Sequence, residues 1–328
     1  MGVGKDILTS LEKNKNVVLG GFIFLLVVYI ITKSLLVGIF TALSLFLYIY
    51  LDFRTSIRSH GWKHEAKELI IAIIIALVIW FGLGFILHTS SPVNAVVSCS
   101  MLPVLQRGDL IILYGGEPVG PVVELDDSDI QNITPLAKVF YKDKFITEVN
   151  GSLLIHCVET GFKEDYCLMF RRDPGEFYEL HGPVKFKYGV CKKKMIDDGR
   201  IVSTICVRGL EVGNLSEDLF PNPALLNQSI IVYTPKKGDL FSSTGDIIHR
   251  VILILRDSNG DVYYLTKGDN NPISDLQMCS NERCNSIITQ DQYKGKVLFR
   301  IPYIGYVKLV LSLKLDLPPG CESYYLGS

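Results

Sequence analysis

The most hydrophobic residues of this chain lie near its start, and the rest of the chain alternates short apolar and polar stretches. Residues 69–87 carry no charge, and a helix of that length spans about 28 Å, close to the hydrocarbon thickness of a bilayer. Residues 17–50 are apolar except around Lys33, and one straight helix of that length would measure about 51 Å. The pattern therefore predicts a transmembrane hairpin over 1–53 and a transmembrane helix over 68–88. One span plus an interfacial helix is the alternative for the hairpin.

The segment between these apolar regions is basic. It carries Arg54, Arg58, Lys63 and Lys67. Because short cytoplasmic loops are enriched in Lys and Arg, we expect residues 54–67 to form a cytoplasmic loop. The next helix then runs outward, so the sequence predicts a multi-pass protein of the cell membrane whose remaining chain is extracytoplasmic.

Beyond the membrane segments the pattern is that of β-strands separated by Gly, Pro and Asp. Expected strands include 109–114, then KVFYKDKFITEV, SLLIHCV, VKFKYGV and RIVSTICVRG, and later SIIVYTP, IIHRVILIL, VYYLTKG, KGKVLFRIP and YVKLVLSLKL. Residues 304–317 are apolar but short and contain two lysines, so we expect a final strand or an interfacial segment there and no fourth span. The predicted fold is a membrane-anchored, all-β extracytoplasmic domain. Its core has two parts, 89–116 and 229–308, which flank a large β-rich insertion over 117–228 and precede a tail over 309–328.

Eight cysteines lie beyond the last predicted membrane helix. Closely spaced cysteines in an exported domain indicate disulfides, although spacing does not fix the connectivity. The neighbouring pairs are Cys157/Cys167, Cys191/Cys206 and Cys279/Cys284. A zinc site is the alternative, and the absence of any C-x-x-C pair disfavours it. Cys99 lies between two serines, and we expect an inert small side chain there rather than a reactive thiol.

Four N-glycosylation sequons fall within one part of the chain, at Asn132, Asn150, Asn214 and Asn227. Their clustering beside paired cysteines indicates an exported, glycosylated surface. The net charge is −1, and acidic and basic residues are interspersed. That distribution gives no sign of a nucleic-acid partner.

Three polar clusters carry candidate chemistry: SCSMLP with the following RGD, then IIHRV, then KGDNN with a later aspartate. A serine nucleophile needs a base for its proton and a carboxylate that orients the base. Ser100, His249 and Asp275 could fill these roles, and Ser98 could donate to an oxyanion. Each cluster also has a simpler interpretation, namely a loop serine, a core histidine and a hairpin turn.

These clusters, together with the later RIPYIGYV, resemble in order the motifs of type I signal peptidases. The resemblance covers roughly residues 90–115 and 229–308. It is to the archaeal and endoplasmic-reticulum type, which uses Ser and His where the bacterial type uses Ser and Lys. Cys99 between the two serines, the long insertion and the additional N-terminal spans depart from the family pattern.

The resemblance implies catalytic roles for four residues. Ser100 would be the nucleophile and His249 the general base. Asp269 and Asp275 match the two acidic positions of the family, and we expect Asp275 to support the histidine. Ser98, Met101 and Pro103 belong to the block that would bind the oxyanion and the substrate.

The same resemblance implies a membrane-bound serine endopeptidase that removes signal peptides from exported preproteins. Its substrates would carry small side chains at the −1 and −3 positions and bind in extended form beside an edge strand. It implies no metal and no organic cofactor. The expected partners are preproteins, the lipid bilayer, and the export channel or accessory subunits. A non-catalytic membrane glycoprotein or binding subunit is the main alternative, and a soluble self-cleaving repressor-type protease is disfavoured by the membrane segments.

Overall fold

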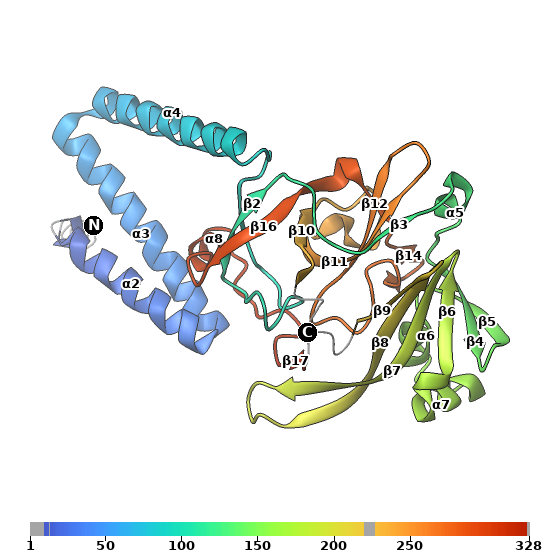
Figure 1. Ribbon diagram of the computed structural model, residues 1–328. Helices are drawn as coiled ribbons and strands as arrows, with labels where there is room; N and C mark the ends of the chain where they lie inside the picture. Colours follow the sequence, from blue (N-terminus) through green and yellow to red (C-terminus); the bar gives the residue numbers. More distant parts are fainter. Residues whose placement is uncertain (1–9, 13, 220–226, 327–328) are drawn as a thin grey trace. The chain divides into compact units, whose positions relative to one another are not determined.

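The computed structural model describes residues 10–12, 14–219 and 227–326. The chain divides into two compact units. The first comprises the described residues up to Val97, with Arg107–Ile111 and Arg300–Pro318. The second comprises Ser98–Gln106, Ile112–Phe299 and the described residues from Pro319 onward. Figure 1 shows the chain coloured along its sequence.

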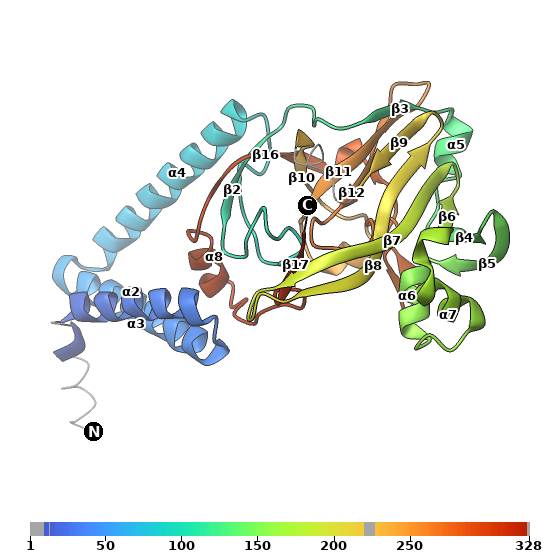
Figure 2. The same cartoon turned by 60° about the horizontal axis from the view of Figure 1, so that its bottom comes forward.

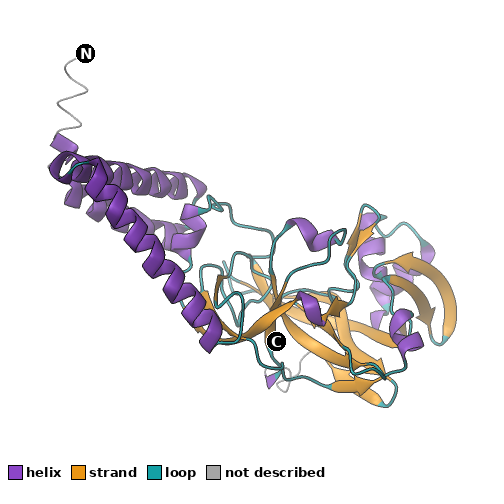
Figure 3. Cartoon of the chain, turned by 90° about the horizontal axis from the view of Figure 1, so that it is seen from above, coloured by secondary structure: helices purple, strands orange, loops and turns teal. Residues whose placement is uncertain are grey.

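The first unit contains three long helices, which Figure 3 draws in purple: α2 (Lys15–Thr32), α3 (Leu35–His60) and α4 (Trp62–Ile86). Each is long and apolar enough to cross a membrane. The predicted break near Lys33 is confirmed, because Lys33 adopts a left-handed conformation with φ 51° at the end of α2. A Cβ on Gly38 of α3 would lie 3.0 Å from the Tyr29 ring of α2, so a small residue permits this close helix contact.

The basic segment 54–67, for which we expect a loop, is helical at every residue except Gly61. Arg, Lys, Glu and Ala are good helix formers, and they extend α3 and α4 beyond their apolar stretches. Gly61 has φ 81° and supplies the break between the two helices. The side of the membrane on which this segment lies stays a prediction.

The RGD residues that follow the serine block also belong to the first unit. Arg107 is buried and donates to the carbonyl oxygens of Lys314 (2.7 Å) and Asp316 (3.0 Å). A Cβ on Gly108 would lie 2.1 Å from the Tyr306 ring, and Asp109 is paired with Arg300 at 2.9 Å. The RGD residues therefore connect the segment 107–111 to the segment 300–318 within the first unit.

The remaining elements of the first unit are short. They are β1 (Val93–Ala95), the start of β2 (Leu110–Tyr114) and α8 (Tyr306–Leu311). The expected final strand YVKLVLSLKL is wrong, because its first residues form helix α8. Tyr306, Leu309 and Val310 of α8 are buried in a cluster with Tyr29 of α2. A short apolar run does not by itself distinguish a strand from a buried helix.

Among its described residues, the second unit contains two large β-sheets and a two-stranded sheet of β13 (Cys279–Ser280) and β14 (Arg283–Cys284). The first has the order β2-β16-β10-β11-β12-β15 and also includes β3, which pairs with β11 in parallel. Its strands are β3 (Val122–Glu124), β10 (Ile230–Tyr233), β11 (Ile247–Arg256), β12 (Val262–Lys267), β15 (Ile288–Thr289) and β16 (Tyr293–Ile301). The expected strands at 109–114, SIIVYTP, IIHRVILIL, VYYLTKG and KGKVLFRIP are confirmed.

The second sheet has the order β5-β4-β6-β7-β8-β9, all strands of the segment 117–228, and the C-terminal strand β17 lies beside β7 (Figure 2). Its strands are β4 (Leu136–Tyr141), β5 (Lys144–Asn150), β6 (Phe177–His181), β7 (Val184–Met195), β8 (Ile201–Val212), β9 (Leu215–Asp218) and β17 (Ser323–Tyr325). Three helices accompany it: α5 (Asp127–Gln131), α6 (Leu153–Glu159) and α7 (Asp165–Arg172). The expected strand SLLIHCV is wrong, because these residues form α6. The Ser152 side chain caps that helix by accepting the Ile155 N–H at 3.1 Å.

One hydrophobic core joins the two sheets. It includes Phe170, Phe177 and Phe186 of the insertion together with Leu253 and Leu265 of β11 and β12. The insertion is therefore packed into the core that also supports β11 and β12, rather than tethered to it as a separate lobe.

All eight cysteines form disulfides, and the three predicted neighbouring pairs are confirmed. The fourth bond joins Cys99 to Cys321 across 222 residues of sequence. Cys99, where an inert small side chain was expected, therefore has no reactive thiol, but it is one half of a disulfide that was not expected. Its partner lies near the C-terminus, and no local pattern in the sequence connects the two. The sequon residues Asn132, Asn150, Asn214 and Asn227 are all exposed.

Candidate active site

The serine block forms a tight turn at the start of the second unit. Within it, Leu102 N–H donates to Cys99 O at 3.2 Å and Leu105 N–H donates to Met101 O at 2.9 Å. The Ser100 hydroxyl lies 3.0 Å from Nε2 of His249 and 3.2 Å from the Ser98 hydroxyl. The turn thus places two hydroxyl groups beside one imidazole.

His249 lies on β11, where its backbone pairs with Ile231 of β10. The side chain is buried, with only 4% of its surface exposed. Its Nδ1 is 2.7 Å from Oδ2 of Asp275, and the Phe241 ring meets the imidazole edge-on at 6.4 Å between centroids. Both ring nitrogens are therefore engaged, one with a carboxylate and the other with a serine hydroxyl. This is the arrangement in which a carboxylate fixes the tautomer of a general base.

Asp275 lies in the loop after β12 and is 3% exposed. Its backbone N–H donates to Thr266 O at 2.9 Å. Besides His249, the hydroxyls of Tyr233 (3.0 Å) and Thr266 donate to the same carboxylate oxygen, Oδ2. Burial, and next the charge of Asp275, raise the pKa of Tyr233 well above its usual value, so Tyr233 stays protonated and acts as a donor.

The second predicted acid, Asp269, has a different partner. Its carboxylate binds the guanidinium of Arg250 through two bonds of 2.8 and 2.7 Å, and both side chains are buried. Arg250 also donates to Gln228 O at 2.7 Å. Asp269 neutralises a buried cation, and the carboxylate that contacts His249 is that of Asp275.

Lys267 is a buried residue of this region that the sequence reasoning did not single out. Its side chain is 1% exposed, and burial lowers its pKa to about 7. The ammonium donates to Gly268 O at 3.0 Å and lies 5.9 Å from the Tyr325 ring centroid. It lies beside the turn 268–271 and is not in the hydrogen-bond chain from Ser100 to Asp275.

The other residues of the predicted substrate block differ in exposure. Met101 is 1% exposed, so its side chain packs the turn from within. Pro103 and Ser98 are partly exposed. Tyr233 and Thr266 were missed from sequence because each is an ordinary strand residue there. Only the pairing of β10 with β11 and of β11 with β12 brings them to Asp275.

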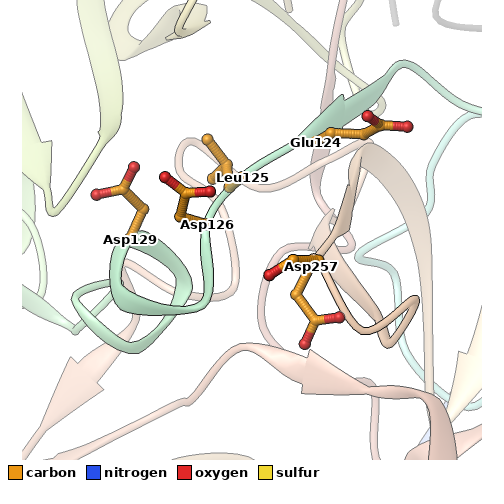
Figure 4. Close-up of a pocket in the computed structure, with 6 residues that line it drawn as sticks. Glu124, Leu125, Asp126, Asp129 and Asp257 are labelled. Atoms are coloured by element: carbon orange, nitrogen blue, oxygen red, sulfur yellow. The ribbon is translucent and has the colours of Figure 1, made fainter.

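A separate cavity of about 300 Å³ lies beside β3 and α5 (Figure 4). Its lining is acidic, with Glu124, Asp126, Asp129 and Asp257. None of Ser100, His249 and Asp275 lines it, so it is distinct from the candidate active site.

Known proteins resemble parts of this chain, although no family model matches it. An uncharacterized protein of Methanocaldococcus jannaschii is 27% identical over 223 residues, which are 67% of this chain and 84% of that protein. The signal peptidase complex catalytic subunit of Emericella nidulans is 32% identical over 114 residues, 31% of this chain and 59% of that subunit. The corresponding human subunit is 32% identical over 66 residues, 20% of this chain and 33% of that subunit.

The matches support a signal peptidase family. To this extent the predicted resemblance is confirmed, while the archaeal type and the Ser–His chemistry stay predictions. The chain spans 59% of the fungal subunit and 33% of the human one. The three candidate membrane helices and the relationship to signal peptidase subunits together indicate a membrane protein.

Proposed function

We propose that this protein is a membrane-bound serine endopeptidase that removes signal peptides from exported preproteins. One observation carries the proposal: an unbroken hydrogen-bond chain from the Ser100 hydroxyl through His249 to the Asp275 carboxylate. The partial similarity to signal peptidase catalytic subunits supports the choice of substrate class.

In the proposed reaction Ser100 Oγ attacks the carbonyl carbon of the scissile peptide bond while His249 Nε2 accepts the hydroxyl proton. The imidazolium then gives that proton to the leaving amine, and an acyl-enzyme remains on Ser100. Water, activated by the same imidazole, hydrolyses the ester and regenerates the serine. Asp275 holds the Nδ1–H tautomer and stabilises the positive charge on His249 during both steps.

The tetrahedral intermediate carries a negative oxygen that needs hydrogen-bond donors. Ser98 is a candidate donor because its hydroxyl lies 3.2 Å from Ser100 Oγ and is partly exposed. The first step needs no metal or organic cofactor, since the three side chains supply nucleophile, base and orienting charge.

The proposed topology places the second unit on the outer face of the membrane and residues 54–67 on the cytoplasmic face. Four disulfides and four exposed sequon asparagines support an oxidising exterior for the second unit. Preproteins and the bilayer are then the primary partners, with the export channel or accessory subunits as further ones.

The test is cleavage of a preprotein by membranes that contain the wild type, Ser100→Ala, or the control Ser203→Ala, which changes an exposed serine of β8. We expect the wild type and Ser203→Ala to release a mature protein whose new N-terminus follows a small residue. Ser100→Ala should lose cleavage by at least about 10³-fold, as expected for removal of a nucleophile. Cleavage by Ser100→Ala at the wild-type rate would refute the proposed nucleophile. Binding of the preprotein without cleavage by folded wild type would favour a non-catalytic binding subunit.

A further inference from the structure

The turn that carries Ser100 is held by a residue outside the proposed triad. The backbone N–H of Asn270 donates to Ser100 O at 2.6 Å, and its side-chain amide donates to Cys99 O at 3.1 Å. Asn270 is 5% exposed. Buried hydrogen bonds of this kind strongly favour one geometry, because breaking them leaves polar groups without water.

The same amide group also binds the C-terminal segment. Nδ2 of Asn270 lies 2.8 Å from Gly320 O and 2.8 Å from Ser323 O. Its two hydrogens are therefore shared among three carbonyl oxygens, which come from two segments far apart in sequence. Asn270 thus joins the serine turn, the turn 268–271 and the C-terminal segment.

A covalent bond duplicates this connection. Cys99, directly before Ser100, is bonded to Cys321, and both are buried in a small cluster with Leu102 and Tyr324. A displacement of the serine turn would therefore also have to displace the buried Cys99–Cys321 bond and the residues packed around it. The disulfide therefore restricts the position of Cys99, the residue directly before Ser100.

The C-terminal segment is anchored in turn to the insertion. Strand β17 pairs with β7, with Ser323 opposite Met195 and Tyr325 opposite Lys193 (Figure 2). Tyr325 is 2% exposed and belongs to the core shared by the two sheets. The insertion therefore fixes the C-terminal segment through β7, and the C-terminal segment in turn fixes the serine turn.

We propose that Asn270 and the Cys99–Cys321 bond are positioning elements that keep Ser100 Oγ within reach of His249. The proposal rests on the proposed function for its kinetic consequence. A nucleophile displaced by about 1 Å can lose about a hundredfold in rate, so an untethered turn should lower kcat. Substrate binding elsewhere should change little, and KM should stay near its wild-type value.

The first experiment compares two double variants in preprotein cleavage. Cys99→Ala/Cys321→Ala removes the tether. Cys157→Ala/Cys167→Ala removes a buried disulfide of the insertion between α6 and α7. We expect the first variant to lose about tenfold or more in kcat with KM within about twofold of wild type, and the second to keep its kcat. An unchanged kcat in the first variant, or equal losses in both, would overturn the positioning role.

Asn270→Ala provides a second route that leaves every disulfide intact. We expect it too to lower kcat about tenfold without moving the pH at which the rate is half-maximal, since His249 and Asp275 are untouched. A rise in KM with kcat unchanged would assign Asn270 to substrate binding and contradict the proposal.

Hydrogen exchange tests the tether without any activity. We expect the amides of Leu102 and Asn270, bonded to Cys99 O and Ser100 O, to exchange about tenfold faster in Cys99→Ala/Cys321→Ala than in the wild type. Amides of β11, such as Val251, serve as the internal control. Equal exchange at Leu102 and Asn270 in both proteins would refute the tether even if the wild type proved inactive. A wild type that cleaves nothing but shows this exchange pattern would separate failure of the proposed function from failure of the tether.

Discussion

At Asp275 a single carboxylate oxygen receives hydrogen bonds from three side chains, of which only His249 transfers a proton in the proposed mechanism. Tyr233 and Thr266 fix the carboxylate so that it faces the imidazole. Bonds to a charged acceptor contribute more than neutral ones, about 1.5–3 kcal/mol each. The orientation of His249 therefore depends on Tyr233 and Thr266, which act on it through Asp275.

We predict that Tyr233→Phe lowers kcat about tenfold, because Asp275 loses one of the donors that orient it. Tyr293→Phe is the matched control, since it removes a tyrosine hydroxyl bond in the same sheet, to Gly116 O at 2.7 Å. The measurement is kcat for preprotein cleavage together with the unfolding midpoint of each variant. Equal kcat in both variants would exclude an orienting role for Tyr233.

The buried side chain of Lys267 should make the stability of the fold depend on pH. Burial lowers its pKa to about 7 in the folded protein, against about 10.4 for an exposed lysine. Between these values the unfolded chain binds a proton that the folded chain does not, so stability rises as pH rises from about 7 to about 10.

We therefore predict that the wild type gains about 2 kcal/mol in unfolding free energy relative to Lys267→Met between pH 7.5 and pH 9.5. Methionine keeps the apolar stem and removes the titrating group. The measurement is denaturant unfolding of both proteins at the two pH values. A constant difference between them would show that Lys267 does not titrate in this window.

The residues of the site were predictable from sequence to the extent that they lie in short motifs. Ser100, His249 and Asp275 were proposed from such motifs, and the structure places them in one hydrogen-bond chain. Tyr233 and Thr266 were not predictable, because their roles arise from strand pairing between distant segments. For the same reason no pattern in the sequence indicates that Cys99 pairs with Cys321, 222 residues away.

At the scale of elements, periodicity predicts five strands of the first sheet, does not indicate the short strands β3 and β15, and is wrong for two short apolar runs. SLLIHCV became α6 because Ser152 caps a helix there, and YVKLVL became α8. Runs of this length fit either structure until their neighbours decide which face is buried. The insertion's contribution to the site was likewise invisible, since it depends on contacts between sheets.

Glu179 of β6 illustrates such a contact. It is fully buried and accepts hydrogen bonds from Leu153 N (3.0 Å), Tyr188 OH (2.7 Å) and the Gln277 amide, and it is paired with His181 at 3.0 Å. Gln277 in turn holds the Ser274 N–H at 2.8 Å, directly before Asp275. The insertion thereby supports the loop that carries the proposed orienting acid.

We predict that Glu179→Gln lowers the unfolding free energy by about 3 kcal/mol, because the amide cannot accept all four donors and loses the charge opposite His181. Glu148→Gln, at an exposed position of β5, is the control and should change the unfolding free energy by less than about 0.5 kcal/mol. The measurement is the unfolding free energy of both variants and of the wild type by chemical denaturation. Equal stability of Glu179→Gln and wild type would mean that the buried network contributes nothing net.

At the scale of the whole molecule, the decisive question is the side of the membrane on which each part lies. All eight native cysteines are paired, so one added cysteine would be the sole free thiol of the chain. Ser59 in the basic segment and Ser203 on β8 are both exposed serines. Ser59→Cys and Ser203→Cys therefore form a matched pair of topological probes.

In sealed right-side-out membrane vesicles, we predict that a membrane-impermeant maleimide labels Ser203→Cys at once. Ser59→Cys should be labelled only after the vesicles are permeabilised, because basic segments beside membrane helices remain in the cytoplasm. Labelling of both cysteines in permeabilised vesicles is the control for accessibility. Immediate labelling of Ser59→Cys with protection of Ser203→Cys would invert the topology. It would also place the disulfides in a reducing compartment, where they do not persist. The predicted outcome instead leaves Ser100, His249 and Asp275 on the face where an exported preprotein emerges.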